Sequence, residues 1–154
     1  MSKEPRRLSD EEYRFTYSRA PRICVDLIVH KEKGFLLTKR AIEPFKGLWH
    51  FPGGRIFYKE SVDEAIARIS EAEVGLTVKN KELLGYLEVL EDGKYVHSVS
   101  MVFLVQFDSG EIRGSLQAQE VKIFEEIPED THPVHEEFLR AHWSYISSRL
   151  KNPA

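Results

Sequence analysis

Apolar residues in the first third of the chain follow a pattern that is typical of buried strands. From Ile23 to Val29 the residues are apolar apart from Asp26, as expected for a strand that is covered on both faces. A turn at residues 31–34 and the run from Phe35 to Arg40 then predict a β-hairpin. The prolines and glycines between residues 44 and 54 predict a loop after this hairpin.

Two longer segments place apolar residues on one face of a helix. The first extends from Ser61 to Val74 and is followed by Gly75, a residue type that commonly ends a helix. The second extends from about Pro133 to Leu150, and a proline suits its first turn. The apolar residues that recur at helical intervals are Val62, Ala65, Ile66 and Ile69 in the first segment, and Leu139, Trp143, Ile146 and Leu150 in the second.

The N-terminal region is expected to add a short helix. Ser9 or Asp10 suits the N-cap position, carboxylates follow in the first turn, and the helix should end before Pro21. We expect residues 9–21 to form this helix and its extension, and residues 1–8 to be mobile.

The middle of the chain predicts further strands. Leu76 to Val78 is a short extended piece, and two strands follow at Leu83–Leu90 and Val96–Phe107, separated by a turn at residues 91–94. A last short strand is expected at Val121–Phe124. Strands interleaved with two substantial helices predict an α/β fold with α/β/α layers.

Length and composition limit the classes of protein that are possible. The 154 residues, 42% of them apolar, fit one compact domain over residues 1–154. The net charge of −3 gives no reason to expect a nucleic-acid or membrane partner. No run approaches the roughly 18 apolar residues of a membrane span, and the polar N-terminus does not resemble a signal peptide, so a cytoplasmic protein is expected. The single cysteine excludes zinc sites built from cysteine clusters.

The most informative residues are spaced along the segment from Gly54 to Leu76. Gly54 is followed six positions later by Glu60 and eight positions after that by Arg68, and the helix ends with Glu73-Val74-Gly75-Leu76. This spacing resembles the Nudix box, and the lead-in at residues 47–54 is also typical of that superfamily. The resemblance covers roughly residues 22–125 and implies the Nudix α/β/α sandwich with a mixed central sheet.

The chemistry of this segment suits a divalent metal. Glycines let backbone carbonyls approach a cation closely, and Glu73 supplies the anionic oxygen that a hard ion such as Mg²⁺ prefers. Mg²⁺ (or Mn²⁺) keeps several waters and bridges to substrate phosphates, so that few protein ligands suffice. We expect Glu60 and Arg68 to form a structural ion pair between the loop and the helix.

The segment departs from the usual Nudix box at two positions. Ile69 and Ala72 stand where most members have carboxylates of the metal cluster. Glu71 does not replace them, because a residue two positions from Glu73 lies on another face of the helix. We therefore expect fewer metal ions than in the multi-metal pyrophosphohydrolases of this superfamily.

The reduced box is similar to that of the GDP-mannose mannosyl hydrolases, which have an alanine directly before the remaining glutamate. This resemblance implies that the metal is held by the Gly53 carbonyl, by Glu73 and by Gln117. It also implies a homodimer that uses the N-terminal region in its subunit contact.

The same resemblance assigns the substrate contacts to Asp26, Arg40 and Arg55. Guanidinium groups suit a diphosphate because they remain charged and offer two parallel donors. Asp26 lies within an apolar strand, where a carboxyl group without a partner would cost several kcal/mol. We therefore expect Asp26 to have a partner in a substrate site or in the protein.

The general base is not fixed by the sequence. In the family it is a histidine directly after the metal-binding glutamine, and this position is Ala118 if Gln117 is the ligand. Shifting the alignment by two makes Gln119 the ligand and Glu120 the base. His132 and His135 are alternative bases, and His50, close to the loop, could contact the substrate.

The function predicted from the sequence is metal-dependent hydrolysis of a nucleotide sugar such as GDP-mannose, with Arg40, Arg55 and Glu120 as catalytic residues. Water would attack the anomeric carbon and release a nucleoside diphosphate and the sugar. One alternative is cleavage of the phosphoanhydride, as in most Nudix hydrolases. A second is a nucleotide-binding module without turnover, which Ala118 at the position of the base favours.

Overall fold

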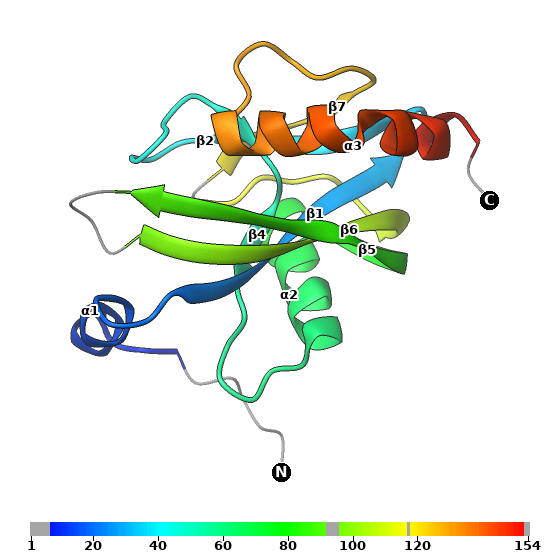
Figure 1. Cartoon of the computed structure of the whole chain (residues 1–154). Helices are drawn as coiled ribbons and strands as arrows, with labels where there is room; N and C mark the ends of the chain where they lie inside the picture. The colour runs from blue at the N-terminus through cyan, green and yellow to red at the C-terminus, as the bar shows by residue number, and fades with distance from the viewer. Residues whose placement is uncertain (1–6, 92–95, 117, 153–154) are drawn as a thin grey trace.

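The computed structural model describes residues 7–91, 96–116 and 118–152. Its centre is a β-sheet that lies between two helices, with α3 above the sheet and α2 below it in Figure 1. A shorter helix, α1, lies at the N-terminal end of strand β1 (Figure 1). The α/β/α layering predicted from the sequence is therefore confirmed. None of the helices in the described ranges is long and apolar enough to cross a membrane.

The sheet contains seven strands in the order β3-β2-β1-β6-β5, and β4 and β7 pair with β1 and β2 outside this path. β1 and β6 are parallel and the other pairs are antiparallel, so the sheet is mixed, as predicted. The strands are β1 (Arg22–Lys31), β2 (Gly34–Arg40), β3 (Trp49–His50), β4 (Gly53–Arg55), β5 (Leu76–Glu91), β6 (Val96–Gly110) and β7 (Ala118–Phe124).

Strand β1 has two different neighbours on one side. Its C-terminal end pairs with β2, where His30 lies opposite Phe35. Its N-terminal half pairs with β4, where Asp26 lies opposite Gly53. The segment between β2 and β4 leaves the sheet and returns to it, and this arrangement brings the glycine-rich segment next to Asp26.

Helix α2 (Val62–Val74) begins and ends as the sequence predicts. Ser61 is its N-cap and forms a capping box with Glu64, which satisfies two backbone N–H groups of the first turn. Gly75 ends the helix in the left-handed region, with φ of 76°. An added Cβ there would lie 2.6 Å from the Glu111 carbonyl oxygen, so glycine is required for space as well as for conformation.

The two other helices differ in the number of buried residues that they contribute. Helix α3 (Pro133–Lys151) packs Phe138, Leu139, Ile146 and Leu150 against the upper face of the sheet. Helix α1 (Asp10–Tyr17) has Ser9 as its N-cap and contains no buried residue. The expectation that residues 1–8 are mobile falls mainly on residues 1–6, which lie outside the described part of the chain.

Two apolar cores lie on the two faces of the sheet. The core on the α3 side contains Ile28, Phe35, Leu37, Trp49, Phe51, Leu87, Val102, Leu104 and the buried residues of α3. The core on the α2 side contains Val25, Leu27, Val29, Leu36, Ala65, Ile66, Ile69, Val74, Leu76, Phe103 and Val105. Successive residues of β1 alternate between these cores, as side chains of a strand must.

Two details differ from the sequence prediction. The expected loop at residues 44–54 contains the short strands β3 and β4, which are too short to show a period of two. The extended piece at Leu76–Val78 and the strand at Leu83–Leu90 are parts of one strand, β5, which continues through irregularities at residues 79–82 and 83–85. The turn predicted at residues 91–94 lies almost wholly outside the described residues.

Candidate active site

Gly53 of β4 lies opposite Asp26 of β1, and its backbone lies directly against the Asp26 carboxyl group. A Cβ added to Gly53 would overlap Asp26 Oδ1 and would lie 2.9 Å from the Val25 carbonyl oxygen. The Leu27 N–H also donates to the Pro52 carbonyl at 2.8 Å. Only a glycine therefore allows the backbone of β4 to pass so close to the Asp26 side chain.

Asp26 is a buried carboxyl group on the α3 side of β1. Burial raises its pKa to about 7, because an apolar surrounding disfavours the charged form, and the neighbouring Ser100 hydroxyl opposes this effect. Ser100 lies on β6, two residues before the Val102 that pairs with Asp26. Asp26 is thus close to half-ionised at neutral pH.

Glu73 lies in the last turn of α2 and is half-buried. The Ser115 hydroxyl donates to its Oε2 at 3.3 Å, and the segment from Arg113 to Leu116 lines an open hollow together with Ala72 and Glu73. Burial raises the pKa of the Glu73 carboxyl, although Ser115 and two guanidinium groups oppose this. These groups belong to Arg40 and Arg68.

The two positions that depart from the usual box have different surroundings. Ile69 is 1% exposed and belongs to the apolar core under the sheet, and its Cγ1 lies 3.5 Å from the position of a Cβ on Gly54. Ala72 is exposed at the hollow beside Glu73. Glu71 points away and binds Arg113 at 2.7 Å. Glu73 is therefore the one carboxylate of this helix end that faces the hollow.

Glu60 and Arg68 form the ion pair predicted from the sequence. Arg68 donates to the two Glu60 carboxylate oxygens at 2.6 and 3.0 Å, and to the Arg55 carbonyl at 2.7 Å. Glu60 also accepts from the Phe57 N–H at 2.9 Å. The pair holds the loop before α2 against the helix, which is a structural role.

The two arginines expected at the substrate lie in different surroundings. Arg40, at the end of β2, donates through Nε to the Pro44 carbonyl at 2.5 Å. Its positive charge lowers the pKa of Glu73, His50 and His132. Arg55 instead donates to the Tyr17 hydroxyl of α1 at 3.2 Å and lies 4.8 Å from the centre of the Phe57 ring.

The structure does not bring Glu120 to the same side as Glu73. Glu120 is exposed on β7 and pairs with Lys122 at 3.6 Å. It lies opposite Lys39 in the sheet, and Lys39 and Lys122 both approach the Trp49 ring of the α3-side core. Helix α2 and Glu73 lie on the other face. Gln117 lies outside the described residues.

The buried His132 and His135 and the half-buried His50 form a group of three rings whose pKa values the charge of Arg40 or of a neighbouring histidine lowers. The His132 and His135 ring centres lie 4.8 Å apart, and those of His50 and His135 lie 6.2 Å apart. Phe45, in the loop after β2, contacts the His132 ring at 4.1 Å. The sequence places these residues more than 80 positions apart at the extremes, so no local signal predicts the group.

Burial keeps all three rings uncharged at neutral pH. Burial lowers the pKa of His50 to about 4, and the charges of Arg40 and His132 lower it further, against the effect of the Phe51 carbonyl. The pKa of His132 is lowered by burial and by Arg40, and that of His135 by burial and by the other two histidines. The group therefore adds polar atoms beside Arg40 without adding charge.

Backbone contacts fix which ring nitrogen carries the proton. His132 Nδ1 accepts from the Val134 N–H at 3.2 Å and His135 Nδ1 accepts from the Phe51 N–H at 3.0 Å, so both carry their proton on Nε2. His50 Nδ1 lies 2.8 Å from the Phe51 carbonyl oxygen and must donate to it. His50 Nε2 is therefore an acceptor, 3.3 Å from the Thr38 hydroxyl.

The described residues contain no group of three or more His, Cys, Asp or Glu side chains that could hold a metal ion. A cation here would thus depend on Glu73, backbone oxygens, waters and phosphate oxygens of a substrate.

Comparisons with known proteins agree with this geometry. A model of the Nudix domain matches residues 20–145. The chain is 32% identical over 141 residues to the low-salt glycan biosynthesis protein Agl8 of Haloferax volcanii, an alignment that covers 88% of this chain and 90% of the relative. It is 36% identical over 105 residues to the ADP-ribose pyrophosphatase of Methanocaldococcus jannaschii, which covers 68% of this chain and 62% of that protein.

Comparison with solved structures also finds Nudix proteins. The crystal structure of a MutT Nudix hydrolase from Burkholderia pseudomallei matches with a TM-score of 0.72 and 25% identity, and covers 79% of this chain and 98% of that one. The matched region of the family model includes β1, the glycine-rich β4, the Glu60–Arg68 ion pair and Glu73. The chain therefore belongs to the Nudix family.

Proposed function

We propose that this protein is a metal-dependent hydrolase of a nucleoside diphosphate derivative, and that its substrate is a nucleotide sugar such as GDP-mannose. The observation that carries the proposal is the reduced box: Glu73 faces the hollow, whereas Ile69 belongs to the core and Ala72 has no ligating atom. The similarity to a protein named for glycan biosynthesis supports a sugar-containing substrate.

The residues around Glu73 fit a single divalent cation. A half-buried carboxyl with a raised pKa beside an open hollow gains most from a cation, because the cation stabilises its charged form. Gly53, Glu73 and Gln117 would hold Mg²⁺ or Mn²⁺, which would neutralise charge on the diphosphate.

Arg40 is the guanidinium best placed to bind the diphosphate. Its positive charge lowers the pKa of Glu73 and of two histidines, which supports a role in binding an anionic group. Asp26 and Arg55 would contact the remainder of the substrate. Asp26, in its charged form, can accept hydrogen bonds from sugar hydroxyl groups.

The proposed reaction breaks the bond between the anomeric carbon and the phosphate oxygen. A water oxygen attacks the carbon, the electron pair of the broken bond leaves with the nucleoside diphosphate, and a base accepts the water proton. With Gln117 as the metal ligand, the position of the family base is Ala118. An alignment shifted by two positions gives Glu120 as the base, although Glu120 lies on the sheet face opposite to Glu73. His50, in the group beside Arg40, is a second candidate, because its Nε2 is an acceptor, 3.3 Å from the Thr38 hydroxyl, and burial keeps the ring neutral.

Two single variants distinguish Glu120 from His50 as the general base. We expect replacement of the true base by glutamine to lower kcat by about 100-fold or more and to leave KM largely unchanged. If Glu120→Gln retains full activity while His50→Gln loses it, the assignment of the base to Glu120 is wrong.

A second candidate reaction is cleavage of the phosphoanhydride bond, which would release a nucleoside monophosphate and a sugar phosphate. The similarity to an ADP-ribose pyrophosphatase supports it. The reduced metal cluster, in which Glu73 is the remaining carboxylate, argues against phosphoanhydride cleavage. Hydrolysis at phosphorus in this family commonly uses several metal ions. A third candidate is nucleotide binding without turnover, favoured by Ala118 at the position of the family base.

Product analysis distinguishes the three candidates. The protein is incubated with GDP-mannose or ADP-ribose and Mg²⁺ in water labelled with oxygen-18, and products are followed by phosphorus NMR and mass spectrometry. GDP and labelled mannose support the proposed reaction. GMP and mannose 1-phosphate, or AMP and ribose 5-phosphate, establish phosphoanhydride cleavage. Binding without any product establishes the binding module.

We also propose that the protein acts as a cytoplasmic homodimer. The resemblance of the N-terminal region to the GDP-mannose hydrolases supports this, and α1 buries none of its residues within the chain.

A further inference from the structure

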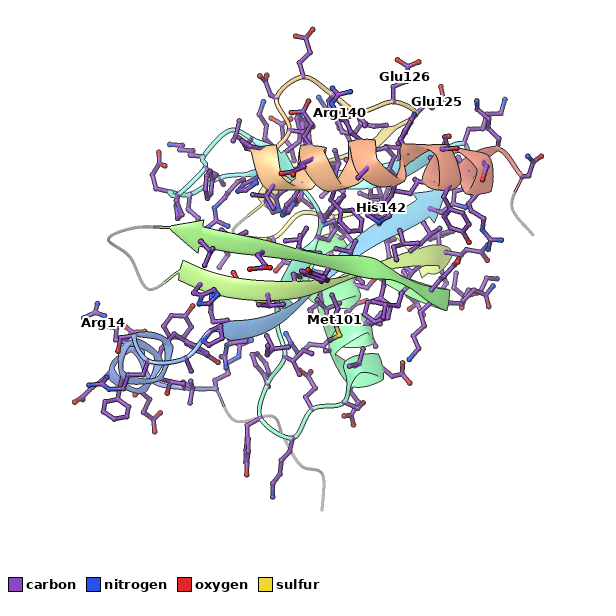
Figure 2. All side chains as sticks on the ribbon, in the orientation of Figure 1. Arg14, Met101, Glu125, Glu126, Arg140 and His142 are labelled. Carbon is purple, nitrogen blue, oxygen red and sulfur yellow. The ribbon has the colours of Figure 1, made fainter. Side chains whose placement is uncertain are left out.

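Three large apolar side chains are exposed in a row on strand β5. Leu83 is 58% exposed, Tyr86 66% and Leu90 68%. Each lies opposite an odd-numbered residue of β6, namely Phe103, Met101 and His97. They therefore share one face of the sheet, the face that α2 covers, and Figure 2 shows Met101 on this side.

This row lies at an open edge of the molecule. β5 is the last strand in the order of the sheet and pairs with β6 only. Helix α2 covers the centre of the sheet, but the C-terminal end of β5 and the N-terminal end of β6 extend past it (Figure 1). Proteins commonly protect long edge strands, and an exposed apolar row on such a strand indicates an interaction surface.

We propose that β5 of a second copy of this chain docks against this row, antiparallel and across a two-fold axis. This deepens the homodimer of the proposed function, and places its contact on β5 rather than on α1. The partner must supply an apolar row of similar length with opposite charges in matching positions, and the strand itself has this pattern.

The charges before Leu83 and after Tyr86 on this face are complementary when the strand is reversed. Lys81 lies on the α2 side, because it forms an ion pair with Asp63 of α2. Glu88 lies on the same side, opposite Val99 of β6. The order along this face is thus Lys81, Leu83, Tyr86, Glu88. When two copies run antiparallel with Leu83 opposite Tyr86, each Lys81 lies opposite Glu88 of the partner subunit.

A groove continues the row at its lysine end. It lies between α2 and the first half of β5, and Ile66, Ala67 and Val78 provide apolar lining. In the antiparallel arrangement, Leu90 of the partner subunit lies one step beyond Lys81, next to this groove. The contact from residue 81 to residue 90 is about 30 Å long, and both copies contribute the same side chains to it.

The contact is made by side chains rather than by a continuous backbone ladder. The irregularities of β5 at residues 79–82 and 83–85 interrupt regular pairing along the edge. They also bring Leu83 and Tyr86, which are three residues apart, to the same face. The specificity therefore comes from the apolar row and from the two symmetry-related pairs of charges.

The test measures the mass of the protein in solution by sedimentation equilibrium over a range of concentrations. We expect a dimer for the wild type, and monomers for Tyr86→Lys and Leu90→Lys with unchanged circular dichroism. Phe15→Lys is the matched control, because Phe15 is 64% exposed on α1, and it should leave the dimer intact.

A charge exchange tests the register. Glu88→Lys should raise the dimer dissociation constant by about tenfold or more, because it places like charges opposite each other. The double variant Glu88→Lys/Lys81→Glu should restore much of the affinity.

Two results would overturn the proposal. A wild-type protein that stays monomeric at its highest soluble concentration excludes both the homodimer and this surface. A dimer that survives Tyr86→Lys and Leu90→Lys but dissociates with Phe15→Lys places the contact on α1, and excludes the β5 surface alone. The hydrolase proposal stands in either case, because none of these variants alters its residues.

Discussion

Burial decides the charge of several residues around the candidate site. It raises the pKa of Asp26 to about 7, raises that of Glu73, and lowers the pKa of the three histidines. Arg40 therefore carries a positive charge next to rings that are neutral. The affinity for an anionic substrate would depend on this positive charge and on the protonation of the surrounding acids.

Asp26→Asn should change how stability depends on pH. The pKa of Asp26 is about 7 in the folded state and 3.8 in the unfolded reference, so the folded state holds the proton more tightly. Its contribution to stability is therefore present at low pH and is lost as pH rises from about 4 to about 7, by about 4 kcal/mol. Asn cannot ionise, so the variant should lack this loss.

The measurement is the free energy of urea unfolding of both proteins at pH 5 and pH 8. Asp108→Asn, which removes an exposed carboxyl, is the control and should follow the wild type. The histidines add an opposite slope below about pH 6.5, but they do so equally in all three proteins. An identical pH dependence for Asp26→Asn and wild type would contradict the burial argument.

The sequence predicted the partners of some residues and not of others. The Glu60–Arg68 pair was predictable, because both residues belong to one local motif and lie eight positions apart. The contact of Arg55 with Tyr17 was not predictable, because it depends on where α1 lies relative to β4. The position of Glu120 on the sheet face opposite to Glu73 was also not predictable, because the alignment does not show on which face of β7 a side chain lies.

Helix α2 is the element that connects the fold to the proposed chemistry. Its capping box and terminal glycine were both predictable, because N-caps and C-caps are local signals. Its apolar face was predictable from spacing, and Ile69 belongs to that face. The consequence is specific to this chain: one position of the usual carboxylate cluster is a core position here.

The two altered box positions should respond differently to the carboxylate that most family members have. Ile69→Glu places a charge in the core and should destabilise the protein by several kcal/mol. Ala72→Glu adds a carboxylate at the exposed hollow and should change stability by about 0.5 kcal/mol or less. Thermal unfolding of both variants checks this. Equal tolerance of the two substitutions would show that Ile69 is not committed to the core.

Strands β3 and β4 show why some elements were not predicted. With two and three residues, they have no periodic pattern, and their glycine and proline content indicates a loop. They exist because β1 and β2 supply partners for their backbone groups. Tertiary pairing, not local preference, creates these strands, and it brings Gly53 to Asp26.

The whole molecule is held together by two cores that share one sheet. Every buried apolar residue of β1 belongs to one core or the other, so loss of packing on one face disturbs the strand that supports the second. The layer order was predictable from alternating strands and helices. The order of the strands was not, because it depends on pairings between distant segments.

The two cores should therefore unfold together. Leu139→Ala, on the α3 side, and Ile69→Ala, on the α2 side, should each lower the free energy of unfolding by about 2–5 kcal/mol. Each variant should show one transition, coincident in near-UV and far-UV circular dichroism. Two separate transitions in either variant would contradict a shared core structure.

The most direct test of the account compares Glu73→Gln with Glu71→Gln. The two glutamates lie two residues apart on α2, but Glu73 faces the hollow and Glu71 binds Arg113. The measurements are Mg²⁺-dependent turnover of GDP-mannose and ADP-ribose, and Mn²⁺ binding followed by electron paramagnetic resonance without substrate. We predict that Glu73→Gln loses metal binding and at least about 100-fold in turnover, while Glu71→Gln matches the wild type. Full metal binding and turnover in Glu73→Gln would contradict the assignment of Glu73 as the metal-binding carboxylate of this protein.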